Sequence, residues 1–401
     1  MNDLKKIISD AFSKGLKEIE IDNVKIDAEQ LDIEISQMAQ FMPMLSQISQ
    51  IQQQMIRAPL AAGLMDVKVE PFRFKPPVEK YKMKISEVTL GATKADGGTR
   101  SCSYTIGGET APPFYFFEGM PKNKPVVAHD VFDMVIPLPK QIKDFFGDAM
   151  ESPGEWAKKR VEMGAKMVVL HLVSTDPNVK NTPIKEAVKS VEEVLQAVKV
   201  PIAVGGSGNP EKDPKLLAKV AEVCEGERVL LNSVDEGMDY KTVAEAVKKY
   251  DQRIITLSSM NPDEMKRLNK NMLKIIGNDQ LVMDLVTGAV GYGIEYSISA
   301  MERSRLAGLK GDAALAVPIA CAGSNAWGAR EAWMKHDEWG PRELRGPLWE
   351  AMTMTTALLC GSDFFLGVHP VAMKTLENVI ESLYGDFKSK EINYESWIQM
   401  K

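Results

Sequence analysis

Polar side chains follow a series of short apolar runs in this chain, at the positions where buried strands would end. They are Asp133, His171, Ser174, Asp176, Ser207, Asn209, Asn232, Ser233, Ser258, Asp284, Thr287, Ser324, Asn325 and His369. Neither a Ser–His–Asp set nor the carboxylate pair of a glycosidase can be recognised among them. These residue types favour a surface that binds by hydrogen bonding over an acid–base or nucleophilic centre.

The segment "VPIAVGGSGNPEKDP" (200–214) clusters glycines where a predicted strand gives way to a loop. Its spacing matches neither G-x-x-x-x-G-K-[ST] nor G-x-G-x-x-G, so a phosphate-binding loop is weakly indicated. Two interpretations stay open. The glycines either permit a tight turn with positive φ angles, or let a flat ligand or another backbone approach closely. Asp213, followed by Pro214, is the expected N-cap of the next helix.

Metal binding is not indicated by the histidines and cysteines. His129, His171 and His369 fall on or near neighbouring predicted strands, where a three-histidine zinc site could be imagined. Hydrogen-bonded interior histidines are the favoured interpretation. The cysteines are Cys102, Cys224, Cys321 and Cys360. Because they are far apart and form no C-x-x-C pair, we expect neither a metal site nor an iron–sulfur cluster in this chain.

The segment 321–350 concentrates large binding-prone side chains. It contains Trp327, Trp333, Trp339, Trp349, Arg330, Arg342 and Arg345. Trp and Arg dominate the energetics of protein interfaces, which favours an interaction surface. The alternative is a long loop that packs its own aromatic residues, and we expect at least two of the tryptophans to do so.

Composition narrows the class of protein. The 401-residue chain is 44% hydrophobic and 26% charged, with a formal net charge of −6. These values are typical of a soluble globular protein and argue against a nucleic-acid partner. The N-terminus has no secretory pattern, and no apolar stretch approaches the roughly 18 residues of a membrane helix. We therefore expect a cytoplasmic protein that does not bind membranes.

From residue 125 onward, predicted strands alternate regularly with predicted helices, and these elements must position the polar side chains. Apolar runs such as "AKMVVLHLVS", "RVLLNS" and "RIITLS" resemble parallel strands that are buried on both faces. The expected intervening helices are 153–163, 184–198, 214–223, 240–250, 262–275, 292–309, 344–359 and 371–383. Eight such units over about 260 residues predict a (β/α)8 TIM barrel, in which functional residues lie on the loops after the strands. A doubly wound open sheet is the alternative, but the dinucleotide fingerprint is missing.

Other segments precede and follow the predicted barrel, which spans residues 123–387. We expect residues 1–80 to form a partly helical extension and linker. Its helical stripe is Leu31, Ile35, Met38, Met42, Leu45, Ile48, Ile51 and Met55. This stripe fits either a helix packed on its own domain or a docking helix for a partner. Residues 81–122 are expected to form a β-hairpin, with a turn at 96–98, and an aromatic loop; residues 388–401 are a tail.

Several long motifs together resemble one protein family. They are "HDVFDMVIPLPK", "ESPGEWAKK", "VEEVLQAVKVPIAVGGSGNPEKDP", "AEVCEGERVLLNS", "AWGAREAW" and "EWGPRELRGPLWE". They are similar to the delta subunits of acetyl-CoA decarbonylase/synthase complexes, the small subunits of corrinoid iron–sulfur proteins. The resemblance covers about residues 84–385. The first 80 residues match the family least well, and no expectation is drawn for them from the resemblance.

This resemblance implies a TIM barrel related to pterin-binding methyltransferases. It also implies a large (gamma) partner subunit that carries the corrinoid and a [4Fe–4S] cluster, so that this chain contacts the corrinoid only at an interface. The wider partners would be acetyl-CoA synthase, carbon monoxide dehydrogenase and a pterin methyltransferase. The barrel mouth would cover the corrinoid during methyl transfer between a tetrahydropterin and the synthase.

The residues expected to contact the corrinoid lie at strand ends of the predicted barrel. They are Ser207, Gly208, Asn209, Asn232, Asp284, Ser324, Asn325 and, with less support, Arg330. No catalytic residue is assigned. Two alternatives stay open. One is a pterin-dependent methyltransferase with its own pocket, in which Asn232 and Asp284 would hold the pterin. The other is an architectural subunit docked through residues 29–57.

Overall fold

Eight parallel strands close into a barrel in a computed structural model that describes residues 77–385. The strands, in chain order, are β3 (Val126–Phe132), β4 (Met167–His171), β5 (Ile202–Gly205), β6 (Leu230–Val234), β7 (Arg253–Leu257), β8 (Leu281–Asp284), β9 (Ile319–Ala322) and β10 (Phe364–Gly367). Consecutive strands are neighbours, and β10 pairs with β3 to close the ring. The closed ring confirms the predicted (β/α)8 barrel and excludes the open sheet.

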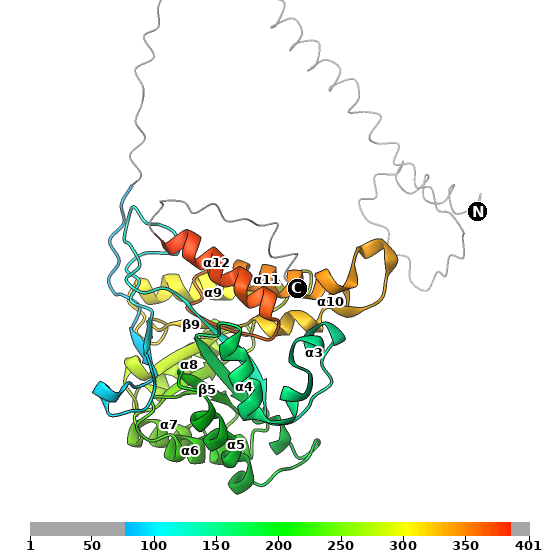
Figure 1. Ribbon diagram of the computed structural model, residues 1–401. Helices are drawn as coiled ribbons and strands as arrows, with labels where there is room; N and C mark the ends of the chain where they lie inside the picture. The colour runs from blue at the N-terminus through cyan, green and yellow to red at the C-terminus, as the bar shows by residue number, and fades with distance from the viewer. Residues whose placement is uncertain (1–76, 386–401) are drawn as a thin grey trace, which may run out of the picture. The chain divides into compact units, whose positions relative to one another are not determined.

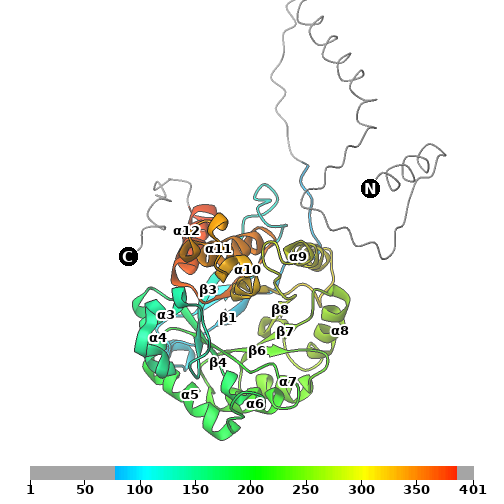
Figure 2. The ribbon, with the colours of Figure 1, turned by 90° about the vertical axis from the view of Figure 1, so that its right-hand side faces the viewer.

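Helices surround the ring of strands, as Figure 1 and, after a turn of 90°, Figure 2 show. They are α3 (Lys140–Phe146), α4 (Pro153–Glu162), α5 (Ile184–Ala197), α6 (Asp213–Val223), α7 (Tyr240–Lys249), α8 (Pro262–Met272), α9 (Ile294–Leu309), α10 (Arg330–Trp333), α11 (Arg342–Leu359) and α12 (Pro370–Tyr384). The expected helices are present with ends shifted by a few residues. The short helices α3 and α10 were not predicted, because each is too brief to produce a helical period in the sequence.

Side chains alternate between two apolar layers along each barrel strand. In β3, Val126 and Ala128 join the cluster inside the barrel, whereas Val127 and Val131 join the larger cluster beneath the helices. Both sets are almost fully buried. The uniformly apolar runs in the sequence therefore reflect strands covered on both faces.

A β-hairpin fills the N-terminal end of the barrel. Strands β1 (Val88–Leu90) and β2 (Tyr104–Ile106) pair antiparallel, which confirms the predicted hairpin. The connection is longer than a simple turn and includes a 3-10 turn at Lys94–Asp96. Val88, Leu90 and Ile106 belong to the same apolar cluster as the residues that line the barrel. The hairpin thus acts as a plug.

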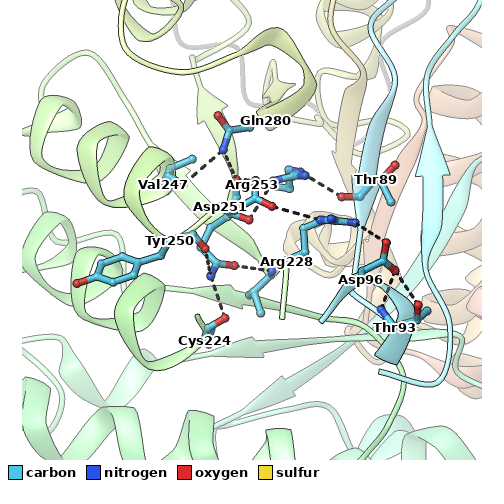
Figure 3. A network of polar contacts seen from close by, with 12 residues as sticks. Thr89, Thr93, Asp96, Cys224, Arg228, Val247, Tyr250, Asp251, Arg253 and Gln280 are labelled. Atoms are coloured by element: carbon cyan, nitrogen blue, oxygen red, sulfur yellow. Dashed lines mark hydrogen bonds and ion pairs between the residues drawn. The ribbon is translucent and has the colours of Figure 1, made fainter. Parts of the chain in front are cut away.

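Polar contacts hold this plug against the barrel, as Figure 3 shows. The buried Arg253 guanidinium donates a hydrogen bond of 3.1 Å to the carbonyl oxygen of Thr89 in β1. Arg228, just before β6, forms ion pairs with Asp96 at 3.7 Å and with Asp251 at 3.5 Å. Because this end is filled, we expect ligands to approach from the opposite end, where the strands finish.

Two sequence predictions fall outside the described part of the chain. The helical stripe in residues 31–55 and the tail 388–401 both lie there. Within residues 77–385, no helix is long and apolar enough to span a bilayer.

Candidate functional site at the barrel mouth

Polar residues replace the apolar lining at the C-terminal ends of the barrel strands. Asp130, His171, Asn232 and Asp284 each lie two residues beyond an apolar residue that lines the barrel interior. Strand pairing sets His171 beside Gly205, and Gly205 beside Asn232. Asp284 ends β8, two strands further around the ring. These residues form the floor of the barrel mouth.

A histidine–aspartate pair occupies one side of this floor. Nε2 of His171 lies 3.0 Å from Oδ1 of Asp130, whose side chain is fully buried. The Arg160 guanidinium, also buried, donates two hydrogen bonds to the backbone carbonyl of Asp130 at 3.0 and 2.7 Å. Phe132 stacks on the imidazole of His171 with 5.1 Å between ring centroids. The imidazole is therefore held from several sides.

Gly205 leaves a notch between His171 and Asn232. A Cβ atom built on Gly205 would lie 3.1 Å from Nδ1 of His171 and 3.4 Å from Nδ2 of Asn232. Any larger residue would occupy this space. Both polar atoms, together with the backbone carbonyl oxygen of Asn232 at 3.1 Å from the same point, therefore lie beside the bare Cα of Gly205 at the floor of the mouth.

Asp284 brings a buried carboxyl group to the other side of the floor. Its Oδ1 accepts a hydrogen bond of 2.8 Å from the backbone N–H of Val286. Burial raises the pKa of Asp284 to about 7, and this single hydrogen bond only partly offsets the effect. At neutral pH, Asp284 can thus be a hydrogen-bond donor as well as an acceptor.

The glycine-rich loop after β5 is held by Asp213, which corrects one prediction. Asp213 is the first residue of α6 rather than its N-cap. Its carboxylate accepts hydrogen bonds from the N–H of Gly208 at 2.6 Å and from the hydroxyl of Ser207 at 3.1 Å. The side chain of Asn209 accepts from the N–H groups of Glu211 and Lys212, in the turn that leads into α6. Ser207, Gly208 and Asn209 thus form a local cluster that shapes the loop.

Gly208 has a φ angle of +89° and is open to solvent, as the tight-turn interpretation requires. Gly206 has a different constraint, because a Cβ atom there would lie 2.4 Å from the Asp213 carboxylate. Both observations explain the glycines by the loop's own geometry.

The segment after β9 contributes the remaining predicted site residues. Ser324 and Asn325 lie in the 3-10 helix Gly323–Gly328, and Asn325 donates a hydrogen bond of 3.1 Å to the carbonyl of Thr287 in the loop after β8. Arg330 is exposed at the start of α10. These residues lie on loops above the floor, whereas Asn232 and Asp284 belong to the floor itself.

The four tryptophans of this segment divide into two pairs. Trp327 donates to Glu350 at 2.9 Å, and Trp349 donates to the carbonyl of Val290 at 3.1 Å, so both pack locally as expected. Trp333 and Trp339 remain partly exposed. With Tyr292 and Tyr296, which are 68% and 65% exposed, they form what we call the aromatic rim.

A buried carboxyl group anchors the loop after β10. Glu350 of α11 accepts hydrogen bonds from the N–H groups of Val368 and His369 and from the indole of Trp327. Burial raises the pKa of Glu350 to about 7, which these hydrogen bonds partly offset. Glu350 thus ties α11 to the end of β10.

The three barrel histidines have separate environments. His129 is buried beneath the helices, and among residues 77–385 neither of its ring nitrogens has a hydrogen-bond partner, in contrast to the hydrogen-bonded interior histidine that was predicted. Its pKa falls to about 3 because of burial and the nearby Arg160. His369 accepts the N–H of Val371 and caps α12. Within residues 77–385, no group of three or more His, Cys, Asp or Glu side chains is arranged to hold a metal ion.

Sequence reasoning gave Asp130 no role and named His171 without assigning it to the site. The two-residue alternation of side chains along a strand could have identified Asp130. Its side chain points to the same face of β3 as those of Val126 and Ala128, so its carboxylate must face the barrel interior at the mouth. The pairing of β3 with β4 then places His171 beside it.

The fold and the polar floor define a (β/α)8-barrel protein whose loops after the strands surround the site. A family model described as CO dehydrogenase/acetyl-CoA synthase delta subunit matches residues 87–337. The chain belongs to this family.

Curated relatives agree with the family model over most of the chain. Acetyl-CoA decarbonylase/synthase complex subunit delta 1 of Methanosarcina thermophila is 46% identical over 330 residues, covering 80% of this chain and 76% of the relative. The delta subunit of Methanocaldococcus jannaschii is 45% identical over 406 residues, covering 99% and 96%.

Among solved structures, the chain is similar to dihydropteroate synthase of Xanthomonas albilineans with 4-aminobenzoic acid. The two share 15% identity with a TM-score of 0.46, covering 67% of this chain and 96% of the other.

Proposed function

We propose that this chain is a subunit of an acetyl-CoA decarbonylase/synthase complex whose barrel mouth covers a corrinoid carried by a large partner subunit. A bound corrinoid would supply the cobalt that carries a methyl group between a tetrahydropterin and the synthase. The chain's own role is to bind the edge of the cofactor and to keep water away from it. Family membership supports the place in the complex, and the polar floor supports the role.

The floor suits binding better than catalysis. Its groups are one histidine–aspartate pair, one asparagine and one buried carboxyl group, and among residues 77–385 no Ser or Cys nucleophile is hydrogen-bonded to His171. This composition offers hydrogen-bond donors and acceptors, of which the side chains of His171 and Asn232 are partly exposed. It is the observation that carries the proposal.

The residues present fit a corrinoid by their chemistry. The rim of a corrin bears acetamide and propionamide side chains, whose N–H and C=O groups need acceptors and donors. His171, Asn232 and Asp284 provide both kinds of group at the floor, and Ser324 and Asn325 provide more above it. None of these residues needs to ligate the cobalt.

The aromatic rim supports a partner at the same end of the barrel. Tyr292 and Tyr296 lie between β8 and the first turn of α9, and Trp333 and Trp339 lie between β9 and α11. These exposed rings therefore belong to segments that follow the barrel strands at the mouth. Exposed Tyr and Trp side chains are typical anchors of protein interfaces. The partner that brings the corrinoid would pack against them.

Co-purification tests this proposal. The full-length chain should bind no corrinoid when produced alone, and should co-purify with a corrinoid-containing complex, identified by its visible absorption, when produced with the large subunit. Stoichiometric corrinoid on the isolated chain would contradict this division of labour. Tight binding and turnover of a methyltetrahydropterin by the isolated chain would instead favour the pterin-dependent methyltransferase.

A further inference from the structure

We propose that His171 and Asn232 together bind a carboxamide edge at the floor of the mouth, and that Asp130 is the positioning residue for His171. The inference rests on the proposed function, because it assigns the carboxamide to a side chain of the corrin. The proposal assigns one hydrogen-bond acceptor, on His171, and one donor, on Asn232, to the recognition of this carboxamide.

The acceptor is Nδ1 of His171. The Asp130 carboxylate accepts the hydrogen bond from Nε2 at 3.0 Å, so Nε2 carries the proton. In the neutral imidazole, Nδ1 then has a free lone pair. Since the side chain of His171 is 20% exposed, a ligand entering the mouth can reach it.

Asp130 is held so that this tautomer is maintained. Its side chain is 1% exposed, and Arg160 fixes its backbone carbonyl with two hydrogen bonds. A buried carboxylate that orients a histidine is a recurrent way to fix which ring nitrogen is available. Asp130 thus acts through His171 and does not itself contact the ligand.

The donor is the side-chain amide of Asn232. Its Nδ2 and Nδ1 of His171 both lie within 3.4 Å of the point where a Cβ of Gly205 would sit. An acceptor and a donor that both lie beside Gly205 at the floor match the adjacent N–H and C=O groups of a primary carboxamide. The lactam edge of a pterin has the same two groups, so the experiment must separate the two sources.

The test compares binding of this chain to its large partner subunit with and without corrinoid. Full-length variants are titrated with the cobalamin-loaded and the cobalamin-free partner, and the ratio of the two dissociation constants is measured by calorimetry. His171→Gln keeps a donor toward Asp130 but removes the acceptor at Nδ1. His171→Asn places an amide oxygen near the position of Nδ1. Gly205→Ala fills the notch without changing any polar group.

For the wild-type chain, we expect tighter binding to the loaded partner. His171→Gln and Gly205→Ala should reduce this preference about tenfold, as expected for one lost hydrogen bond with an unpaired partner. His171→Asn should restore part of it. Glu245→Gln, on the exposed face of α7, should leave the ratio unchanged.

The outcomes distinguish failure of the inference from failure of the proposed function. If the wild-type chain binds both forms of the partner equally, no corrinoid contact exists and the proposed function fails. If the wild-type preference is present but His171→Gln retains it, the carboxamide site is wrong. If the wild-type chain binds a tetrahydropterin and His171→Gln abolishes that binding while the corrinoid preference persists, the edge belongs to a pterin.

Discussion

At the scale of single residues, two aspartates at equivalent strand positions in the mouth have different hydrogen-bond partners. Asp130 and Asp284 occupy equivalent phases of β3 and β8, each beyond an apolar residue of the interior. Asp130 is paired with His171, whereas Asp284 has one backbone N–H as its partner. Of the two, only Asp284 was predicted at the mouth from the sequence. The different partners of Asp130 and Asp284 were not predictable, because they depend on which residues the neighbouring strands bring alongside.

Asp284→Asn should change how stability depends on pH. The pKa of Asp284 is raised to about 7 in the folded chain, so the native state retains a proton that the unfolded state releases near pH 4. The free energy of unfolding of the wild-type chain should therefore carry a component that falls between about pH 4 and pH 7. The Asn variant keeps the acceptor for Val286 and should be more stable above pH 7, by on the order of 4 kcal/mol.

Urea denaturation across this pH range measures the effect. Asp148→Asn, at an exposed position, is the matched control and should follow the wild-type curve. Parallel curves for wild type and Asp284→Asn would contradict a raised pKa at this site.

Glu350→Gln should change the pH dependence of stability in the same direction. The pKa of Glu350 is raised to about 7 even though three N–H donors surround its carboxylate. The free energy of unfolding of the wild-type chain should therefore fall relative to that of the Gln variant between about pH 4 and pH 7, by on the order of 3 kcal/mol. Glu343→Gln, exposed on the same helix, should show no such change relative to the wild-type chain. A constant difference between the wild-type chain and Glu350→Gln across this range would contradict the raised pKa.

At the scale of elements, the loop after β5 shows what glycine spacing can and cannot indicate. The sequence indicates a loop that needs glycine, and the φ angle of Gly208 confirms it. The expected N-cap was wrong, because Asp213 is the first residue of α6 and its carboxylate accepts from the loop, whereas the Asn209 side chain accepts from the turn just before the helix. Asp and Asn both accept hydrogen bonds from backbone N–H groups, and the path of the loop in space decides which groups each of them meets.

Gly208→Ala should destabilise the chain by about 1–2 kcal/mol through backbone strain alone, since no atom lies within 4 Å of the added Cβ. Gly208→Asn should lose less, because Asn tolerates positive φ angles better. Gly328 is the control: it has equally open space but no positive φ, so Gly328→Ala should be nearly neutral. Thermal unfolding of the three variants checks this, and equal losses for Ala at both positions would refute the strain argument.

At the scale of the whole molecule, the alternation of apolar runs and helical patterns predicts the barrel, because each strand is buried on both faces and therefore leaves a strong signal. The hairpin was also predicted, but its role as a plug was not. Its three-residue strands show alternation, whereas their insertion into the barrel depends on long-range contacts such as that of Arg253 with Thr89.

Leu90→Ala should therefore destabilise the barrel as a unit. Leu90 is fully buried among residues that line the barrel, so its truncation should cost about 3 kcal/mol. Unfolding followed by tryptophan fluorescence and by circular dichroism should show one shared transition at a lower midpoint. Leu359→Ala, on an exposed face of α11, should change the midpoint little. Separate transitions in Leu90→Ala would mean that the hairpin folds independently of the barrel.

Deuterium exchange of the full-length chain, alone and in complex with its corrinoid-loaded partner, tests the central claim most directly. The account predicts slower exchange in the loops after β5, β6, β8 and β9, with unchanged exchange in the hairpin β1–β2 at the opposite end. Slower exchange confined to the hairpin end, with the mouth loops unaffected, would contradict a barrel mouth that covers the cofactor.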